Sequence, residues 1–244
     1  MDFNRELFQS SLLQGLKEWE LDLVVKPQLH AVTRFVELVL ETNRSLNLTR
    51  IVEADEMAIK NVLDSLAPLR LSWPSRQKCL DLGTGAGFPG IPLAICQPQW
   101  SWILLDSLRK RLRFLDQAAE SLGMVNVATL HARAEDVGQA ADHRESYDLV
   151  VSRAVASLPV LLELAAPLVK VGGVFLAYKS SDALAELEES SKALQLLQMQ
   201  IEQVFATDLP FSMGERSLLL FRKTGKTPPL YPRRAGLPSK QPLK

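Results

Sequence analysis

The sequence predicts an α/β fold: a doubly wound, mostly parallel sheet preceded by a helical N-terminal portion. From Lys78 onward, short apolar runs alternate with stretches of helical periodicity, as in successive β–α–β crossovers. A glycine-rich run, Asp81–Gly87, follows the first apolar run directly. Before about residue 66, glycine and proline are nearly absent and apolar residues recur at three- and four-residue steps, which indicates helices.

The N-terminal portion carries recognisable helix boundaries. Pro27 is expected to open the second helix, because the first turn of a helix needs no N–H donor at that position. The segment Asn43–Asn47 indicates a helix exit, and another short helix is expected from about Glu53. We expect this portion to cover the sheet as a helical cap.

The expected strands are short apolar runs, mostly separated by helical segments. They are 78–82, 102–106, 125–130, 147–152, 173–178, 201–206 and 217–222, and the helices between them are 90–97, 108–122, 134–141, 157–170 and 181–195. No helix separates the last two strands, which predicts a terminal hairpin adding one antiparallel strand. The chain therefore divides into a helical portion (1–66), an α/β domain (67–222) and a basic, proline-rich tail (223–244) expected to be irregular.

Composition restricts the class of protein. Hydrophobic residues at 47% and charged residues at 23% are ordinary globular values. No stretch reaches the roughly 18 apolar residues of a membrane span, and the acids among the first residues do not fit a secretion signal. Cys79 and Cys96 stand in apolar surroundings, and neither they nor the histidines have metal-ligand spacing. We expect a cytoplasmic protein with no metal and no membrane association.

The net charge is zero, yet two segments are strongly basic. Residues 222–244 contain seven lysines and arginines and no acid, and a second cluster comprises Arg109, Lys110, Arg111 and Arg113. Local basic patches on a neutral protein can bind nucleic acid. A solvated helix face and a solubilising tail explain the two clusters equally well.

The glycine-rich run discriminates between two cofactor classes. A dinucleotide fingerprint needs Gly-x-Gly-x-x-Gly, but counting from Gly83 puts Phe88 where the last small residue belongs. The run fits acid-x-Gly-x-Gly-x-Gly instead. In that form a strand-terminal acid, here Asp81, and the bare backbone of Gly83 and Gly85 hold the methionine end of S-adenosylmethionine.

Further acids stand at the ends of the next two strands. Asp106 lies 25 residues after Asp81, where a carboxylate can accept both ribose hydroxyls; capping of the following helix is the alternative. After the third strand, Ala134 and Glu135 can meet the adenine edge, and a helix-terminal charge is the alternative for Glu135.

Arg153 ends the fourth strand, at the edge where ligands bind in open parallel sheets. A buried guanidinium needs an anionic or ligand partner, which favours a functional placement. The sequence lacks the Asn/Asp-Pro-Pro-aromatic motif that polarises an exocyclic amine and the Pro-Cys nucleophile that attacks pyrimidine carbon six. The methyl acceptor is therefore expected to be an atom with its own available lone pair.

The order of these motifs resembles the RsmG (GidB) family, which methylates a guanine N7 in 16S ribosomal RNA of the small subunit. The similarity runs from about Asn43 to Arg222, and the Phe88–Pro92 extension and Ser152-Arg153-Ala154 are its most discriminating parts. The other segments that match the family pattern are Leu46-Asn47-Leu48-Thr49, Val62-Leu63-Asp64-Ser65-Leu66, Leu105-Asp106-Ser107, Lys110-Arg111, Phe114-Leu115 and Arg133-Ala134-Glu135. Two positions depart from the family pattern: Lys60-Asn61 stand where members commonly have a histidine, and Ser180 replaces the glycine that often follows Lys179.

The resemblance implies a class I S-adenosylmethionine-dependent methyltransferase fold and a guanine N7 acceptor in 16S ribosomal RNA or the small subunit. We separately expect the protein to act as a monomer. An N7 acceptor agrees with the absence of the motif that polarises an exocyclic amine, because N7 already bears a lone pair in the neutral base. The implied cofactor contacts are Gly83, Phe88, Asp106, Ser107, Leu108, Ala134, Glu135 and Arg153. Arg153, Lys179 and Arg216 are candidates for contacting RNA phosphate or orienting the guanine.

Three other functions stay open at this stage. A methyltransferase of the same fold can act on a small molecule or a protein, which the basic segments disfavour only modestly. A non-catalytic RNA-binding assembly module with a relic pocket is disfavoured by the intact glycine run and Asp106. An NAD-linked dehydrogenase is disfavoured by Phe88 and by the lack of a second substrate domain.

Overall fold

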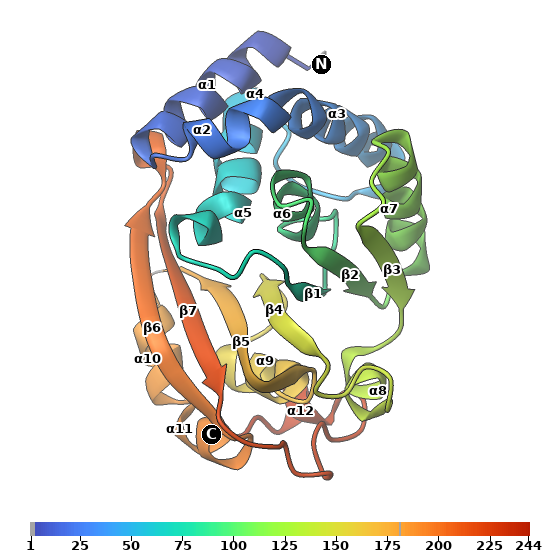
Figure 1. The fold of residues 1–244 in the computed structure, drawn as a ribbon, viewed down its shortest axis with the longest axis vertical. Helices are drawn as coiled ribbons and strands as arrows, with labels where there is room; N and C mark the ends of the chain where they lie inside the picture. Colours follow the sequence, from blue (N-terminus) through green and yellow to red (C-terminus); the bar gives the residue numbers. More distant parts are fainter. Residues whose placement is uncertain (1–2, 181) are drawn as a thin grey trace.

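The computed structural model of the protein describes residues 3–180 and 182–244. A seven-stranded sheet in the order β3-β2-β1-β4-β5-β7-β6 crosses the molecule (Figure 1). The strands are β1 Lys78–Leu82, β2 Ser101–Asp106, β3 Val127–His131, β4 Tyr147–Arg153, β5 Val169–Lys179, β6 Met199–Asp208 and β7 Glu215–Lys223. Strands β1 to β5 pair in parallel, and β7 lies antiparallel to both β5 and β6. The predicted doubly wound sheet with one antiparallel terminal strand is confirmed.

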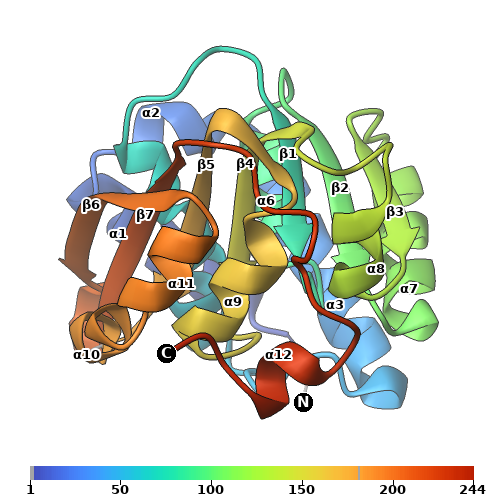
Figure 2. The ribbon, with the colours of Figure 1, turned by 90° about the horizontal axis from the view of Figure 1, so that it is seen from below.

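Helices cover both faces of the sheet (Figures 1 and 2). On the first face lie α1 Arg5–Glu18, α2 Asp22–Val25, α3 Leu29–Leu46, α6 Gly90–Cys96 and α7 Arg109–Ser121. On the second face lie α8 Ala134–Gln139, α9 Leu158–Ala165, α10 Ala183–Glu188, α11 Ser191–Leu196 and α12 Leu237–Lys240. Alternate residues of β4 enter opposite cores: Leu149 and Val151 the first, and Val150 the second.

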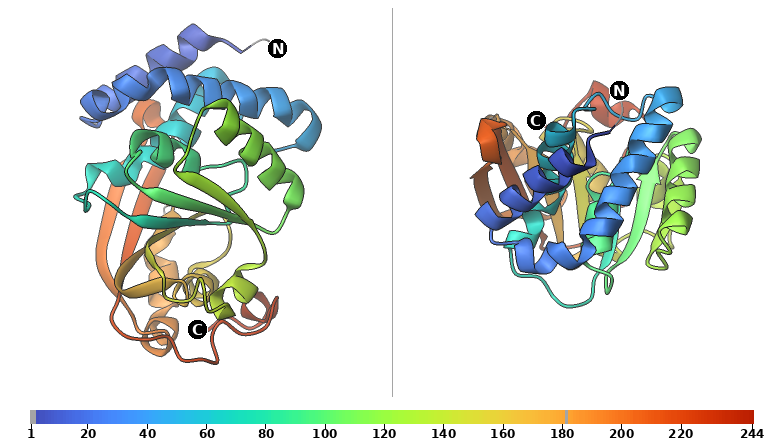
Figure 3. Two further views of the ribbon diagram at one scale, coloured as in Figure 1. Left: turned by 45° about the vertical axis from the view of Figure 1, so that its right-hand side comes forward. Right: turned by 90° about the horizontal axis from the view of Figure 1, so that it is seen from above.

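The N-terminal helices share the first core with the sheet. Phe8 of α1 and Phe35 of α3 are fully buried in the same apolar cluster as Val151 of β4. Helix α3 also lies alongside α7, which follows β2 (Figure 3). The helical portion is therefore anchored by apolar burial, the main favourable term in folding, and not only by surface contacts.

The helix boundaries predicted for this portion are confirmed. Pro27 lies in the 3-10 turn Lys26–Gln28 that leads into α3, and α3 ends at Leu46 with Asn47 as its C-cap, which is left-handed with φ of +49°. Glu53 is the N-cap of α4 (Ala54–Glu56). The next segment, η2 (Met57–Leu63), is a seven-residue π-helix followed by α5 (Asp64–Leu66). The π-helix was not predicted, and such segments occur often at functional sites.

Two helix predictions are wrong in detail. The helix expected at 157–170 ends at Ala165, because Val169 joins β5 and pairs with Tyr147 through an irregular register. The helix expected at 181–195 is two helices, α10 and α11, and its expected first residue lies outside the described residues. The break falls at Ser190, whose hydroxyl donates to the carbonyl of Glu186.

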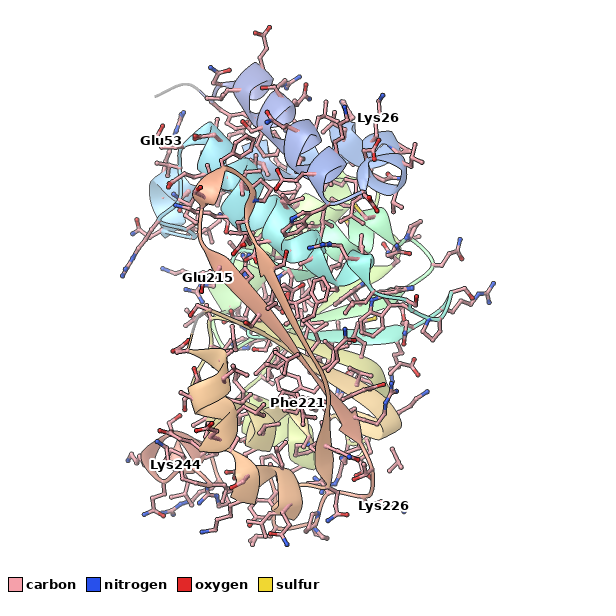
Figure 4. All side chains as sticks on the ribbon, turned by 90° about the vertical axis from the view of Figure 1, so that its left-hand side faces the viewer. Lys26, Glu53, Glu215, Phe221, Lys226 and Lys244 are labelled. Carbon is pink, nitrogen blue, oxygen red and sulfur yellow. The ribbon has the colours of Figure 1, made fainter. Side chains whose placement is uncertain are left out.

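The C-terminal tail is mostly irregular, as expected, but it is packed against the second face. The β6–β7 hairpin runs along one flank of the molecule, with Glu215 near the N-terminal helices and Lys226 at the far end (Figure 4). From there the chain returns beneath α9, where Tyr231 is buried. Arg233 donates its backbone N–H and its guanidinium to Glu163 of α9, whose side chain is fully buried.

Replacing Arg233 with alanine is expected to lower the free energy of unfolding by about 3 kcal/mol or more, because a buried carboxylate loses its charged partner. Lys244→Ala is the matched control in the same tail: its ion pair with Glu189 is about half exposed at both ends, at 55% and 54%, so it should cost less than about 1 kcal/mol. Urea unfolding followed by circular dichroism measures both. Equally small losses in the free energy of unfolding of the two variants would show that the tail is not anchored at Glu163.

Candidate functional site

The glycine-rich loop connects β1 to α6 in a backbone conformation that only glycine adopts easily. Gly83, Gly85 and Gly87 have φ values of +75°, +60° and +96°. The N–H groups of Gly83 and Thr84 both donate to the carbonyl of Leu105 in β2, at 2.9 and 3.0 Å. The loop is thus held against the neighbouring strand and has little freedom to move.

The surroundings of the loop fit the predicted cofactor. A Cβ at Gly83 would lie 2.5 Å from Cγ2 of Val155, whereas a Cβ at Gly85 would meet only the Gly83 carbonyl, at 3.9 Å. Bare backbone therefore borders open space at Gly85. Beneath the loop, the buried Oδ1 of Asp81 and Oγ1 of Thr84 have no hydrogen-bond partner among the described residues. A narrow cradle of backbone with unsatisfied polar atoms below it suits the amino-acid end of S-adenosylmethionine.

Asp81 lies at the end of β1 but below the surface of the loop. Its side chain is fully buried, and its Oδ2 accepts a hydrogen bond of 2.9 Å from the N–H of Gly90, the first residue of α6. Burial raises the pKa of this carboxyl to about 6, and the neighbouring Thr84 side chain and the hydrogen bond from Gly90 oppose that rise. In the described structure Asp81 supports the loop from beneath.

Asp106 joins the loop to the next helix. Its Oδ1 accepts from the N–H of Leu108, at 2.8 Å, and its Oδ2 accepts from the N–H of Gly85, at 3.0 Å. Arg111 approaches Oδ2 at 3.4 Å. Asp106 therefore lies directly beside the glycine loop and is not the N-cap of α7, because that position is Leu108 and no side chain caps the helix. Ser107 and Leu108 are exposed at the same edge.

Ala134 and Glu135 begin α8, beyond the end of β3. The Oε1 atom of Glu135 accepts a hydrogen bond of 2.9 Å from the N–H of Gly236 in the C-terminal tail. The tail thus reaches the strand ends and holds one oxygen of this carboxylate. Sequence reasoning placed Glu135 near the adenine but gave no sign of its contact with the tail.

Arg153 at the end of β4 has the anionic partner that its burial requires. Its Nη1 donates to Oδ2 of Asp64 at 2.9 Å, and its Nη2 donates to Oδ1 of Asn61 at 3.2 Å. The guanidinium carbon lies 5.6 Å from the ring centre of Phe88, which extends the glycine loop and packs on Phe35. Arg153 therefore connects the glycine loop to the N-terminal helices.

The other two basic candidates lie close to Arg153. Arg216 at the start of β7 donates from Nε to Oδ1 of Asp64 at 2.9 Å, and Lys179 at the end of β5 pairs with Glu186 at 2.7 Å. All three line one pocket with a volume of about 450 Å³, bordered also by the π-helix. This volume lies in the range of small-ligand pockets and accommodates a nucleobase.

The sequence reasoning missed the residue at the centre of this arrangement. Asp64 is 2% exposed and gives one carboxylate oxygen to each of two arginines. Its signal was present: it is an acid between apolar residues in a buried helical segment, and a buried carboxylate needs a cationic partner. Glu186, which neutralises Lys179, was likewise given no role.

Two classes of site find no support in the described part of the chain. Residues 3–180 and 182–244 contain no group of three or more His, Cys, Asp or Glu side chains placed to hold a metal ion. Within the same residues, no helix is both long enough and apolar enough to cross a membrane.

Comparison with known proteins decides the family. The family model described as "GidB: rRNA small subunit methyltransferase G" matches residues 28–217. The chain belongs to this family. It is 44% identical over 234 residues to ribosomal RNA small subunit methyltransferase G of Desulforamulus reducens, covering 96% of this chain and 97% of that protein. It is 41% identical over 243 residues to the enzyme of the same name from Acetivibrio thermocellus, covering 100% of both.

Solved structures agree on the fold. The chain resembles TYW2 of M. jannaschii, crystallised with AdoMet, with a TM-score of 0.52 and 15% identity, covering 67% of this chain and 76% of that one. It also resembles the tRNA methyltransferase TrmK of B. subtilis, with a TM-score of 0.52 and 9% identity, covering 69% and 67%. The predicted class I methyltransferase fold of this GidB-family chain is thereby confirmed.

Gly83→Ala is expected to weaken binding of S-adenosylmethionine at least about tenfold, because the added Cβ is strained at positive φ and collides with Val155. Isothermal titration calorimetry measures the affinity. Gly123→Ala is the matched control: it has a φ of +64° with nothing within 4 Å, between α7 and β3 at the opposite end of the sheet, and should bind normally. Wild-type affinity in both variants would remove the loop from the cofactor site.

The stability contributed by Asp81 should depend on pH. Because its folded-state pKa of about 6 lies above the ordinary 3.8, folding favours the protonated form. Its contribution is therefore fully present below about pH 4 and is lost as the pH rises through about 6. The free energy of unfolding of the wild type minus that of Asp81→Asn should fall by on the order of 3 kcal/mol over this pH range. It should stay level at higher pH. Urea unfolding at several pH values tests this, and a flat difference would contradict it.

Proposed function

We propose that the protein transfers a methyl group from S-adenosylmethionine to N7 of a guanine in 16S ribosomal RNA of the small subunit. The observation that carries the proposal is family membership over 78% of the chain, residues 28–217, together with an intact glycine loop and acceptor pocket. The cofactor supplies a methyl group on a sulfonium, which is electrophilic without further activation. The protein has to bind, orient and desolvate the two reactants.

The cofactor half of the site is built from the ends of three strands. The backbone of Gly83 and Gly85 would hold the methionine end, with Asp81 fixing the loop from below. Asp106 would meet the ribose hydroxyls beside Ser107 and Leu108. Oδ1 of Asp106 accepts one N–H, from Leu108, and retains a further lone pair, whereas Oδ2 accepts from both Gly85 and Arg111. Ala134 and Glu135 would border the adenine, with one Glu135 oxygen held by the tail.

The acceptor half is the pocket lined by Arg153, Lys179 and Arg216. Phe88 and Arg153 lie at the junction of the two halves, in contact through the ring face. Guanine N7 carries its lone pair in the neutral base, so the reaction needs no general base. This agrees with a pocket in which Asp64, the carboxylate beside the two arginines, is engaged by both of them.

The RNA itself is proposed to dock through charge. Arg109, Lys110 and Arg113 are exposed at the start of α7, next to Asp106. In the tail, by contrast, Lys223 is buried and Arg233 is paired with Glu163, so these two charges serve the fold. The cluster on α7 is therefore the better candidate for phosphate contacts. We further propose that the protein works as a monomer in the cytoplasm.

Cells with the protein should carry a 7-methylguanine in 16S ribosomal RNA that cells without it lack, and mass mapping of modified nucleotides tests this directly. Purified protein should transfer label from S-adenosylmethionine to the unmodified RNA or small subunit. Protein that binds the cofactor but labels neither would support action on a small molecule or protein. Protein that binds no cofactor would support a non-catalytic RNA-binding module.

A further inference from the structure

We propose that Asp64 is a positioning residue of the acceptor pocket: its buried carboxylate fixes Arg153 and Arg216 as a pair of donors directed at the target nucleotide. The inference rests on the proposed function, because it assigns the pocket lined by Arg153 and Arg216 to the methyl acceptor. Asp64 does not touch the RNA in this scheme. It acts through the two arginines that it holds.

The three residues come together from distant parts of the chain. Asp64 begins α5, Arg153 ends β4 and Arg216 lies at the start of β7. Each arginine takes a different oxygen of the same carboxylate, both at 2.9 Å. The long β6–β7 hairpin makes this possible, because it carries the start of β7, marked by Glu215, toward the N-terminal helices (Figure 4).

The π-helix fixes Arg153 further. The carbonyls of Lys60 and Asn61 accept from Nη1 of Arg153 at 3.2 and 3.4 Å, and the Asn61 side chain accepts from Nη2 at 3.2 Å. With Phe88 against one face of the guanidinium, the side chain is held from two sides. An arginine fixed this way pays little further conformational entropy when substrate binds.

Burial and charge direct this pair toward the pocket. Asp64 is 2% exposed, while the side chains of Arg153 and Arg216 are 16% and 24% exposed. Two guanidinium groups share one carboxylate, so the accessible part of the trio carries an excess positive charge. The two lysines that also line the pocket, Lys60 and Lys179, are each paired with a glutamate, Glu56 and Glu186 respectively. The arginine pair is thus the main fixed source of positive charge available to a substrate there.

The matching chemistry is an oxygen acceptor on the target nucleotide. On guanine, O6 neighbours N7 on the major-groove edge, and guanidinium groups pair readily with that edge. A donor at O6 orients the base and leaves the N7 lone pair free for methyl transfer. The phosphate of the same nucleotide offers the same kind of acceptor. Either contact requires the guanidinium groups to be held in place, which is the role of Asp64.

The test compares Asp64→Asn with wild type in single-turnover methylation of unmodified small-subunit RNA at saturating S-adenosylmethionine. Asparagine keeps the shape but removes the charge, so the rate should fall about 100-fold, the loss typical of a small misplacement of a reacting group. Calorimetric cofactor binding confirms that the glycine loop is intact. Asp148→Asn is the matched control: this carboxylate holds Lys170 and the N–H of Lys78 at the opposite end of the sheet, and its loss should leave the rate unchanged.

A double-mutant cycle separates positioning from a merely structural role. The loss of rate caused by Asp64→Asn should be on the order of tenfold smaller in an Arg216→Met background than in the wild-type background. The reason is that Asp64 has already lost one of its two partners in the Arg216→Met protein. If Asp64→Asn does not fold, Arg216→Lys tests the same contact: it keeps the charge but loses the Nε donor to Asp64, and should slow turnover about tenfold.

The outcomes are distinct. An Asp64→Asn rate within twofold of wild type, or an equal loss in both backgrounds, would overturn the role of Asp64 and leave the proposed function standing. If Asp64→Asn does not fold, turnover of Arg216→Lys at the wild-type rate would likewise overturn the role of Asp64 and leave the proposed function standing. Wild-type protein that methylates no small-subunit RNA would overturn both.

Discussion

A carboxylate buried at the edge of the sheet constrains how the two main parts of this molecule meet. Asp64 belongs to the N-terminal helical portion, and both of its partners belong to the α/β domain. Leaving it unpaired would be strongly unfavourable, so the helices can dock only where Arg153 and Arg216 reach it. Apolar burial attaches the N-terminal helices, but a carboxylate with two directional partners selects one position for them. The pocket lined by Asp64, Arg153 and Arg216 forms where the helices meet these strand ends.

A buried carboxylate also fixes the position of the C-terminal tail. Glu163 is fully buried on α9, and Arg233 in the tail meets it with a backbone N–H and two guanidinium nitrogens. Lys223 is also buried, and burial lowers its pKa to about 8 against the opposing effect of Glu145. A count of basic residues in the tail therefore overstates the charge that it offers to RNA.

The sequence predicted the sheet, the glycine loop and the positions of Asp106 and Arg153, because these depend on local periodicity and on the edge at which parallel strands end. It did not predict the π-helix Met57–Leu63, since no local pattern distinguishes i→i+5 from i→i+4 bonding. It missed the pairing of Val169 with Tyr147, which extends β5 into an expected helix. The partners of Asp64 and Glu163 also lay beyond sequence reasoning, because each ion pair joins residues brought together only by the tertiary fold.

Arg153 links the two halves of the site physically. Its guanidinium faces Phe88 of the glycine loop and is held by Asp64 and Asn61 on the side of the helices. A shift of the loop would therefore disturb the acceptor pocket, and a shift of the helices would disturb the loop. An acceptor that already carries a lone pair depends for its rate mainly on how well it is oriented toward the methyl group. Under the proposed function, the contacts of Arg153 with Phe88, Asp64 and Asn61 would supply that orientation without a general base.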